Sequence, residues 1–277
     1  MGWLGKLFGR GDGPPAIAAP SRNKLAFVLL AEPRLPELAP LIAAFELYSE
    51  PGEHLEAGAE EAPKKPELET LTLRLSSGET VIVGLMPVAV PGDEVEAGFA
   101  RGVGSFRPGF TAPSHVAHLV VFFSGADDVD DLTSFSRFTA LLAALAKSAP
   151  SVGVYLGSAA VAHDTEFFLK LAFARDTVAR MTLWNGVSLA KRPYGALSLL
   201  STGMPQIGLP DLLLETRSST PTEALTSFFD LLTYVAELGR PLAAHETVGR
   251  TAEEKLHVKY VRSPIDPKAR VWHVELP

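Results

Sequence analysis

Four consecutive residues, His163, Asp164, Thr165 and Glu166, place an imidazole beside two carboxylates and are the first candidates for acid–base chemistry. They follow a predicted strand and begin a predicted helix, where ligand sites of α/β proteins commonly form. An imidazole next to a carboxylate suits a general base in a hydrolase or the recognition of an anion. The structural alternative is that Asp164 or Thr165 caps the helix, while Glu166 interacts favourably with the helix dipole.

A second polar segment has the sequence His245-Glu246-Thr247-Val248-Gly249. It begins like a zincin helix motif, but Gly249 stands where the second histidine would be, and the segment is predicted to be a loop. In the hydrolase hypothesis, His245 and Glu246 complete one pocket with His163. That pocket requires the two imidazoles to lie within about 12 Å of each other, because acid–base work depends on hydrogen-bond reach.

Three further patterns lack a residue that their chemistry requires. His115 and His118 are three residues apart on a predicted strand, so their side chains lie on opposite faces and do not chelate one metal ion. Residues 102–107 lack the third glycine of a dinucleotide loop and the ending of a P-loop, which leaves a flexible loop or a simple anion site. Residues 157–159 do not complete a nucleophile elbow. We therefore expect neither a metal centre nor a cofactor.

The composition is that of an ordinary globular protein, with 277 residues, 47% hydrophobic and 21% charged, and a net charge of −7. The basic residues are scattered, so the sequence argues against nucleic acid as a partner. The absence of cysteine excludes disulfides, thiolate metal sites and cysteine nucleophiles. No apolar run reaches the roughly 20 residues of a membrane span, and we expect a cytoplasmic protein.

The first 20 residues are predicted to be a flexible tail with a short apolar peptide. In a helical conformation, residues 1–10 place four large apolar side chains on one face: Trp3, Leu4, Leu7 and Phe8. Such a face suits docking into a protein groove or peripheral contact with a membrane surface. Against this, Gly2, Gly5 and Gly9 each cost about 1 kcal/mol in a helix, and isolated helices below about 12 residues are marginal in water. A docking peptide and a disordered start both stay open.

Residues 21–180 are predicted to form an N-terminal α/β region. Apolar runs and hydrophobic periodicity indicate, in order, strand 25–31, helix 35–48, a hairpin of 71–75 and 81–85, a short helix after 93, strand 116–123, a helix after 131, strand 152–156 and helix 165–180. The segment 116–156 is predicted to be a βαβ unit with a right-handed crossover. The acids that precede its helix suit the helix dipole: Asp127, Asp128, Asp130 and Asp131.

Residues 181–277 are predicted to form a C-terminal α+β region, with strands at 183–189, 197–200, 212–215, 256–261 and 271–276. Thr220-Pro221-Thr222-Glu223 fits a capping box with proline at the first helical position, and Gly239 supplies the stop. The whole chain is therefore assigned to the α+β class, as a mixed sheet with helices packed on it. A ferredoxin-like duplication is one arrangement of these elements.

The C-terminal third resembles a bacterial family known as domain of unknown function 4261. The resemblance rests on the following segments: Tyr194-Gly195, Gly208-Leu209-Pro210-Asp211-Leu212, the helix end at residues 234–239, and the loop at 245–249. In that loop, His245-Glu246 replaces the Gly-Asp-like turn that the family pattern implies. The resemblance implies a bacterial α+β domain and carries over no reaction, cofactor or site residue.

Two classes of function follow from these observations. The first is a non-enzymatic protein-interaction module, acting as an adaptor, inhibitor or immunity-type partner of another protein. The second is a hydrolase or anion-binding enzyme centred on the turn from His163 to Glu166. We prefer the first hypothesis because no segment of the sequence completes a catalytic motif.

Overall fold

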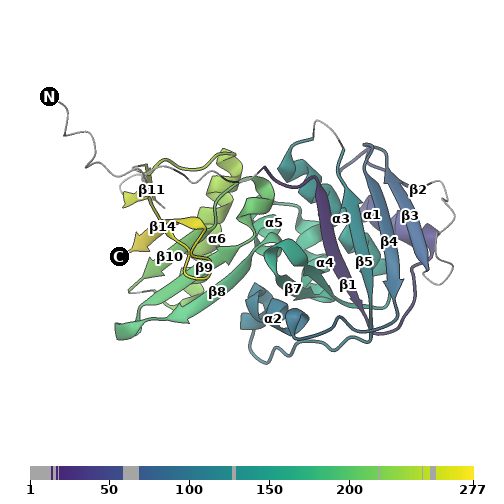
Figure 1. The fold of residues 1–277 in the computed structure, drawn as a ribbon, viewed down its shortest axis with the longest axis horizontal. Helices are drawn as coiled ribbons and strands as arrows, with labels where there is room; N and C mark the ends of the chain where they lie inside the picture. The colour runs from purple at the N-terminus through teal and green to yellow at the C-terminus, as the bar shows by residue number, and fades with distance from the viewer. Residues whose placement is uncertain are drawn as a thin grey trace. The chain divides into compact units, whose positions relative to one another are not determined.

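The computed structural model describes residues 14, 17, 19–58, 69–126, 129–217, 219–244, 246–249 and 254–277. These residues form two compact units, which we call the N-terminal unit (Pro20–Val187) and the C-terminal unit (Ser188–Pro277) (Figure 1). Both contain helices and β-sheets, so the α+β fold class is confirmed. The division into regions 21–180 and 181–277 stays a prediction.

The N-terminal unit is built on one seven-stranded sheet (Figure 1). Across the sheet its strands are β2 (Leu55–Ala57), β3 (Thr70–Leu75), β4 (Thr80–Met86), β5 (Ala117–Ser124), β1 (Asn23–Leu30), β6 (Ser151–Leu156) and β7 (Val161–Asp164). Each strand is antiparallel to its neighbours. The parallel strands β5 and β6 therefore flank β1, and the parallel strands β1 and β4 flank β5. This interleaving is the split βαβ arrangement of a ferredoxin-like fold, with β2, β3 and β7 added.

Helices cover one face of this sheet. The helical segments of the unit are α1 (Leu38–Tyr48), α2 (Glu94–Arg101), α3 (Asp131–Ser148), α4 (Thr165–Ala174), α5 (Thr177–Trp184) and the 3-10 turns Val103–Phe106 and Gly157–Ala159. α1 and α3 pack against each other, and α3 also contacts β1 and β6. The rings of Phe123 on β5 and Phe138 on α3 lie 5.3 Å apart, so the core forms between this face and the helices.

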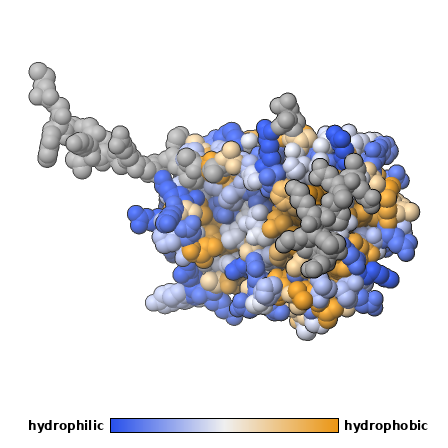
Figure 2. All heavy atoms as spheres, turned by 45° about the vertical axis from the view of Figure 1, so that its right-hand side comes forward, coloured by the Kyte–Doolittle hydropathy of each residue, from blue (hydrophilic) through white to orange (hydrophobic). Residues whose placement is uncertain are grey.

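The opposite face of the sheet is only partly covered. α2 packs over its β7 side, where Val95 and Phe99 join a small apolar cluster with Tyr155. Away from α2, the cross-strand neighbours Leu25, Phe122 and Ile82 are 44%, 39% and 46% exposed. We call these three residues the apolar row. Figure 2 shows hydrophobic side chains, in orange, gathered in patches among hydrophilic ones on one side of the molecule.

The helix predicted over residues 165–180 is wrong, because the chain forms two helices, α4 and α5, in its place. Arg175 ends α4 in the left-handed region, with φ of 59°. Asp176 then starts α5, since its carboxylate accepts a hydrogen bond from the backbone N–H of Ala179 at 2.7 Å. A new N-cap at this point restarts the helix in another direction. The strand predicted from residue 183 correspondingly starts later, as β8 (Gly186–Lys191).

The C-terminal unit is a five-stranded mixed sheet with one long helix. Its strands lie in the order β13 (Lys259–Arg262), β14 (Arg270–Leu276), β10 (Leu212–Thr216), β9 (Leu197–Thr202) and β8. Its other elements are α6 (Pro221–Leu238), the 3-10 turns Pro193–Gly195 and Met204–Ile207, and the short pair β11 (Thr247–Val248) and β12 (Leu256–His257). β10 and β14 are parallel neighbours, and their other pairings, with β9 and β13, are antiparallel.

The long helix α6 begins and ends as the sequence predicts. Thr220 and Glu223 form the capping box, and Gly239 ends the helix in the left-handed conformation, with φ of 66°. α6 packs on β9 and β10, against the sheet face that carries Leu276. Among the residues that the structure describes, no helix combines the length and the apolar character that crossing a bilayer requires.

The two sheets differ in strand order, so the ferredoxin-like arrangement occurs once, in the N-terminal unit, and the duplication is not present in the described residues. In the C-terminal unit, α6 lies between β10 and β14 in the chain, and these two strands are parallel and adjacent. The carboxyl ends of adjacent parallel strands lie at one edge of a sheet, where open α/β sheets commonly bind ligands. This edge is the part of the fold that positions the candidate site.

Candidate metal centre

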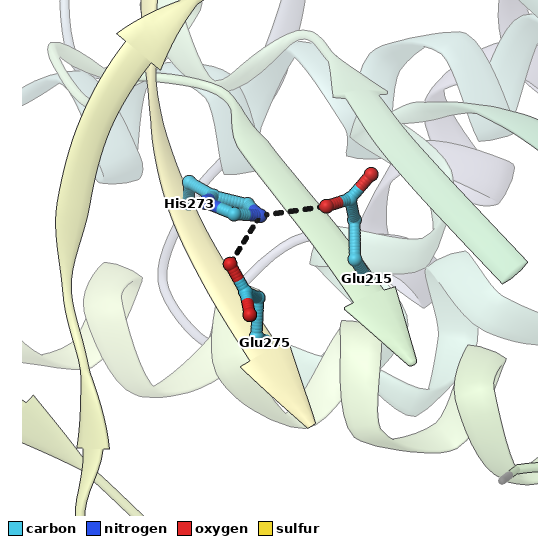
Figure 3. A group of neighbouring side chains, drawn as sticks. All are labelled: Glu215, His273 and Glu275. Carbon is cyan, nitrogen blue, oxygen red and sulfur yellow. Dashed lines mark hydrogen bonds and ion pairs between the residues drawn. The ribbon is translucent and has the colours of Figure 1, made fainter. Parts of the chain in front are cut away.

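Three potential metal ligands lie together on β10 and β14: Glu215, His273 and Glu275 (Figure 3). Glu215 is directly opposite Glu275 in the parallel pair, and His273 is two residues before Glu275 on the same strand. Because side chains alternate along a strand, all three lie on the same face of the sheet. Leu276 lies against α6 on the other face, so the three ligands point away from that helix.

Their ligand atoms are close enough to share one ion. One ligand atom from each residue lies within 4.8 Å of the others. The Nε2 atom of His273 is 3.1 Å from a carboxylate oxygen of Glu215 and 4.0 Å from one of Glu275 (Figure 3). A tetrahedral ion with bonds of about 2.1 Å separates its ligand atoms by about 3.4 Å. The separation of 4.0 Å exceeds this value, so coordination by all three residues requires the exposed Glu275 side chain to move closer to His273.

The three residues differ in their freedom to move. The His273 side chain is 9% exposed, whereas the side chains of Glu215 and Glu275 are 38% and 55% exposed. The imidazole is thus held in the sheet, and the carboxylates face solvent. A fixed histidine with two adjustable carboxylates can accept an ion without rearranging the backbone.

Two cationic side chains stand beside the carboxylates. Arg192, which follows β8, is 4.0 Å from Glu215, and Lys259, on β13, is 4.0 Å from Glu275. Both distances are at the outer limit of an ion pair, and both partners are substantially exposed, so each contact is weak. They leave the carboxylates available to a stronger partner such as a divalent cation.

A cleft of about 840 Å³ adjoins the same edge of the sheet. Glu215 and Glu275 lie in its wall, together with Arg217, which follows β10, and the turn between β8 and β9 that holds Arg192 and Tyr194. Its volume falls within the range that small-molecule sites in proteins occupy, about 300–1,000 Å³. The carboxylates of Glu215 and Glu275 are thus open to a space much larger than a metal ion.

The comparison with protein families gives a match that covers this edge. Residues 200–275 match the model of a family described as Domain of unknown function (DUF4261). The C-terminal unit carries a DUF4261 match. The resemblance expected from the sequence is confirmed, and the DUF4261 match includes Glu215, His273 and Glu275. No curated protein and no solved structure gives a significant match to the chain.

Two of the three residues of this cluster could have been found in the sequence. His273 and Glu275 are separated by one residue on the strand predicted at 271–276, and this alternation places both on one face. Glu215 lies 58 residues before His273 and joins it only through the register of β10 and β14. The family is described only as a domain of unknown function, so the match names no ligand residues that would have pointed to Glu215.

The segment that matches DUF4261 also contains a half-buried acid, Asp211, which precedes β10. Its Oδ1 accepts hydrogen bonds from the Ser201 hydroxyl at 2.8 Å and from the Met204 backbone N–H at 3.2 Å. Burial nevertheless raises the pKa of Asp211 to about 6, because the cost of desolvating the carboxylate exceeds the stabilisation from these bonds. Asp211 fastens the turn before β10 and lies outside the cleft wall.

His163, the first candidate from the sequence, lies in the core of the N-terminal unit. It is 2% exposed, its Nε2–H donates to the Leu183 carbonyl at 3.0 Å, and its ring stacks on Phe167. Burial lowers the pKa of His163 to about 4, so the ring is neutral near pH 7. The buried Nδ1 atom has no hydrogen-bond partner among the described residues. A group enclosed in this way has no visible route to a substrate.

The neighbours of His163 support its structural interpretation. Asp164 caps α4 by accepting from the Phe167 backbone N–H at 3.0 Å, and it also pairs with Arg107. Thr165 shares a hydrogen bond with Ser151 at 2.8 Å. Glu166 is exposed in the first turn of α4. The catalytic role of this turn stays an untested prediction.

The remaining predicted site residues give no further support. Glu246 holds a turn in the C-terminal unit: its carboxylate binds Arg240 through two hydrogen bonds of 2.8 and 3.0 Å. His245 lies outside the described residues, so the predicted pocket of His163 and His245 stays untested. The proposed docking peptide of Trp3, Leu4, Leu7 and Phe8 and the acids Asp127 and Asp128 also lie outside them.

Proposed function

We propose that the C-terminal unit, which carries the DUF4261 match, binds a divalent transition-metal ion through Glu215, His273 and Glu275. The observation that supports this most is the convergence of three ligand atoms within 4.8 Å from two parallel strands. Three protein ligands leave coordination positions free, as in metal sites that also bind a small molecule. Glu215 and Glu275 also line the cleft, so a small molecule there lies beside two of the three ligands.

The ligand types restrict the ion. One imidazole and two carboxylates suit Zn²⁺, Mn²⁺ or Fe²⁺. Ca²⁺ prefers six to eight oxygen ligands, and Cu⁺ prefers thiolates and thioethers, of which the cluster has none. Imidazole and carboxylate ligands bind metal ions in their deprotonated forms, so the affinity falls as the solution becomes more acidic.

Isothermal titration calorimetry of the full chain with Zn²⁺ and with Mn²⁺ tests this proposal. We expect one ion per chain, and a loss of affinity of at least about 100-fold in His273→Gln and in Glu215→Gln, because each removes a direct ligand. His257→Gln and Glu237→Gln are matched controls, since both residues are exposed in the same unit and neither belongs to the cluster.

The metal proposal fails if neither ion binds the wild-type chain, or if the control variants lose as much affinity as the ligand variants. Circular dichroism of each variant separates the loss of a ligand from the loss of the fold. Glu275→Gln gives a second check, because Glu275 is the most exposed of the three ligands and its substitution leaves the sheet intact.

A second candidate function is the protein-interaction role, and the apolar row of the N-terminal unit favours it. The row has an aromatic ring in the middle, Phe122, and an aliphatic side chain at each end, Leu25 and Ile82. A two-fold rotation about an axis through Phe122 therefore places Leu25 of one copy against Ile82 of the other, so that apolar side chains meet as a two-fold interface requires. We propose that the partner that binds the apolar row is a second copy of this chain. The adaptor, inhibitor or immunity-type role stays a hypothesis.

Sedimentation equilibrium of the full chain tests this second function. We expect the wild type to dimerise and Ile82→Lys to be monomeric, because the substitution buries a charge in the interface. Ile265→Lys is the matched control, since Ile265 is an isoleucine exposed to 62% in the other unit. A monomeric wild type at all accessible concentrations, or equal effects of the two substitutions, contradicts self-association.

A further inference from the structure

We infer that the cleft beside Glu215 and Glu275 receives a small ligand with an anionic oxygen group, which completes the coordination of the bound metal ion. This inference rests on the proposed metal site and specifies what that site is for. It names a ligand class, a phosphate or a carboxylate, and the arginines that recognise it, Arg192 and Arg217.

The position of the cleft supports a ligand in direct contact with the metal. Its wall contains the carboxyl ends of the parallel strands β10 and β14, and the turn between β8 and β9 at residues 192–196. The two metal-binding carboxylates belong to the same wall. A molecule in the cleft therefore lies beside two of the three proposed metal ligands.

Charge decides which kind of molecule fits. In the protein alone, the carboxylates of Glu215 and Glu275 partly compensate the cationic groups of Arg192, Arg217 and Lys259. A bound divalent cation occupies those carboxylates, so the cationic groups lose their nearby negative partners. The metal-loaded cleft then has an excess of positive charge, which attracts an anion and repels a cation.

Arg192 is placed to bind that anion together with the ion. Its guanidinium has five N–H donors, and its contact with Glu215 is a long one, at 4.0 Å. When Glu215 turns to the metal, this guanidinium can donate two parallel hydrogen bonds to a phosphate or carboxylate. Arg217 contributes a second guanidinium to the same cleft wall.

An unusual backbone conformation occurs in the same wall. Tyr194 adopts φ of 60° and ψ of 24°, in the left-handed region, and its side chain is fully exposed. This conformation is unfavourable for a residue with a Cβ atom, and such residues often occur where a ligand binds. The conformation presents an aromatic ring at the cleft that holds Arg192 and the two glutamates.

Titration of the full chain with anions, with and without Mn²⁺, tests the inference. The probes are inorganic phosphate and succinate, which separate the two sources of an anionic oxygen group. We expect at least one of them to bind at least 10-fold more tightly when Mn²⁺ is present. In Arg192→Gln/Arg217→Gln the anion affinity falls at least 10-fold, while the affinity for Mn²⁺, measured by electron paramagnetic resonance of the free ion, stays within about 3-fold of wild type.

Arg262→Gln is the matched control, because Arg262 is an exposed arginine in the same unit and is not part of the cleft wall. If Mn²⁺ binds but neither anion does, or if anion affinity is the same without the ion, the anion site is refuted and the metal site stands. If Mn²⁺ does not bind the wild type, the metal proposal and this inference both fall. Equal loss of anion affinity in the control variant also overturns the inference.

Discussion

Two buried histidines, one from each unit, lie in contrasting environments. His163 in the N-terminal unit donates to a backbone carbonyl in a packed core, and its pKa is lowered to about 4. His273 in the C-terminal unit lies within β14, beside the more exposed carboxylates of Glu215 and Glu275. Three of the four consecutive polar residues that begin at His163 thus make structural hydrogen bonds, whereas residues far apart in the sequence form the candidate metal cluster. Contiguous polar residues often serve caps and turns, and a sheet can gather a site from distant segments.

If His163 is structural, acid should destabilise the N-terminal unit through it. Its folded pKa of about 4 lies below the ordinary value of 6.5, so the unfolded chain binds more protons between these values. The stabilisation is present in full above pH 6.5 and is lost as the pH falls towards 4. It amounts to about 3 kcal/mol. We expect urea unfolding to show this loss in the wild type and a smaller loss in His163→Gln, which keeps a hydrogen-bond donor. If the variant keeps the pH dependence of the wild type, then His163 is not the residue that makes the N-terminal unit sensitive to acid.

Asp211 should give the C-terminal unit the opposite pH dependence. Its folded pKa of about 6 is above the ordinary value of 3.8, so the folded chain binds more protons between these values. The contribution of Asp211 to the free energy of unfolding therefore falls as the pH rises from 3.8 to 6. The fall is about 2 kcal/mol, because the partial exposure of the side chain weakens the effect. In Asp211→Asn, the amide oxygen can still accept from Ser201 and Met204, and this dependence should disappear. Hydrogen exchange of α6 and β10 amides at pH 4.5 and 7 measures it, and equal changes in variant and wild type would contradict the assignment.

Local signals in the sequence predicted much of the fold. The capping box of Thr220 and Glu223 and the stop at Gly239 were both predicted, because their chemistry involves only neighbouring residues. The break at Arg175 was not, since arginine is a good helix former and only the conformation of the folded chain reveals its positive φ. Asp176 offered a weak signal as an N-cap residue, which the continuing apolar periodicity obscured.

The candidate site could be predicted only in part, for a related reason. Alternation along the last strand fixes the common face of His273 and Glu275 without any knowledge of the fold. The partner strand and its register are properties of the tertiary structure, and a shift of one residue would turn Glu215 to the other face. The pairing of Glu215 with Glu275 across β10 and β14 is therefore information that the structure adds.

The smallest expected effects separate the two interpretations of the turn that begins at His163. Asp164→Ala removes the N-cap of α4 and the partner of Arg107, and should destabilise the N-terminal unit by about 1 kcal/mol. Glu166→Ala changes an exposed side chain in the first helical turn, and should change stability by less than about 0.5 kcal/mol. Urea unfolding at pH 7 measures both. A catalytic turn predicts another pattern, in which Glu166→Ala and Asp164→Ala keep the fold and both abolish an activity. That result would place a catalytic site in the N-terminal unit, because it would show that these contiguous residues act in a reaction as well as in capping a helix.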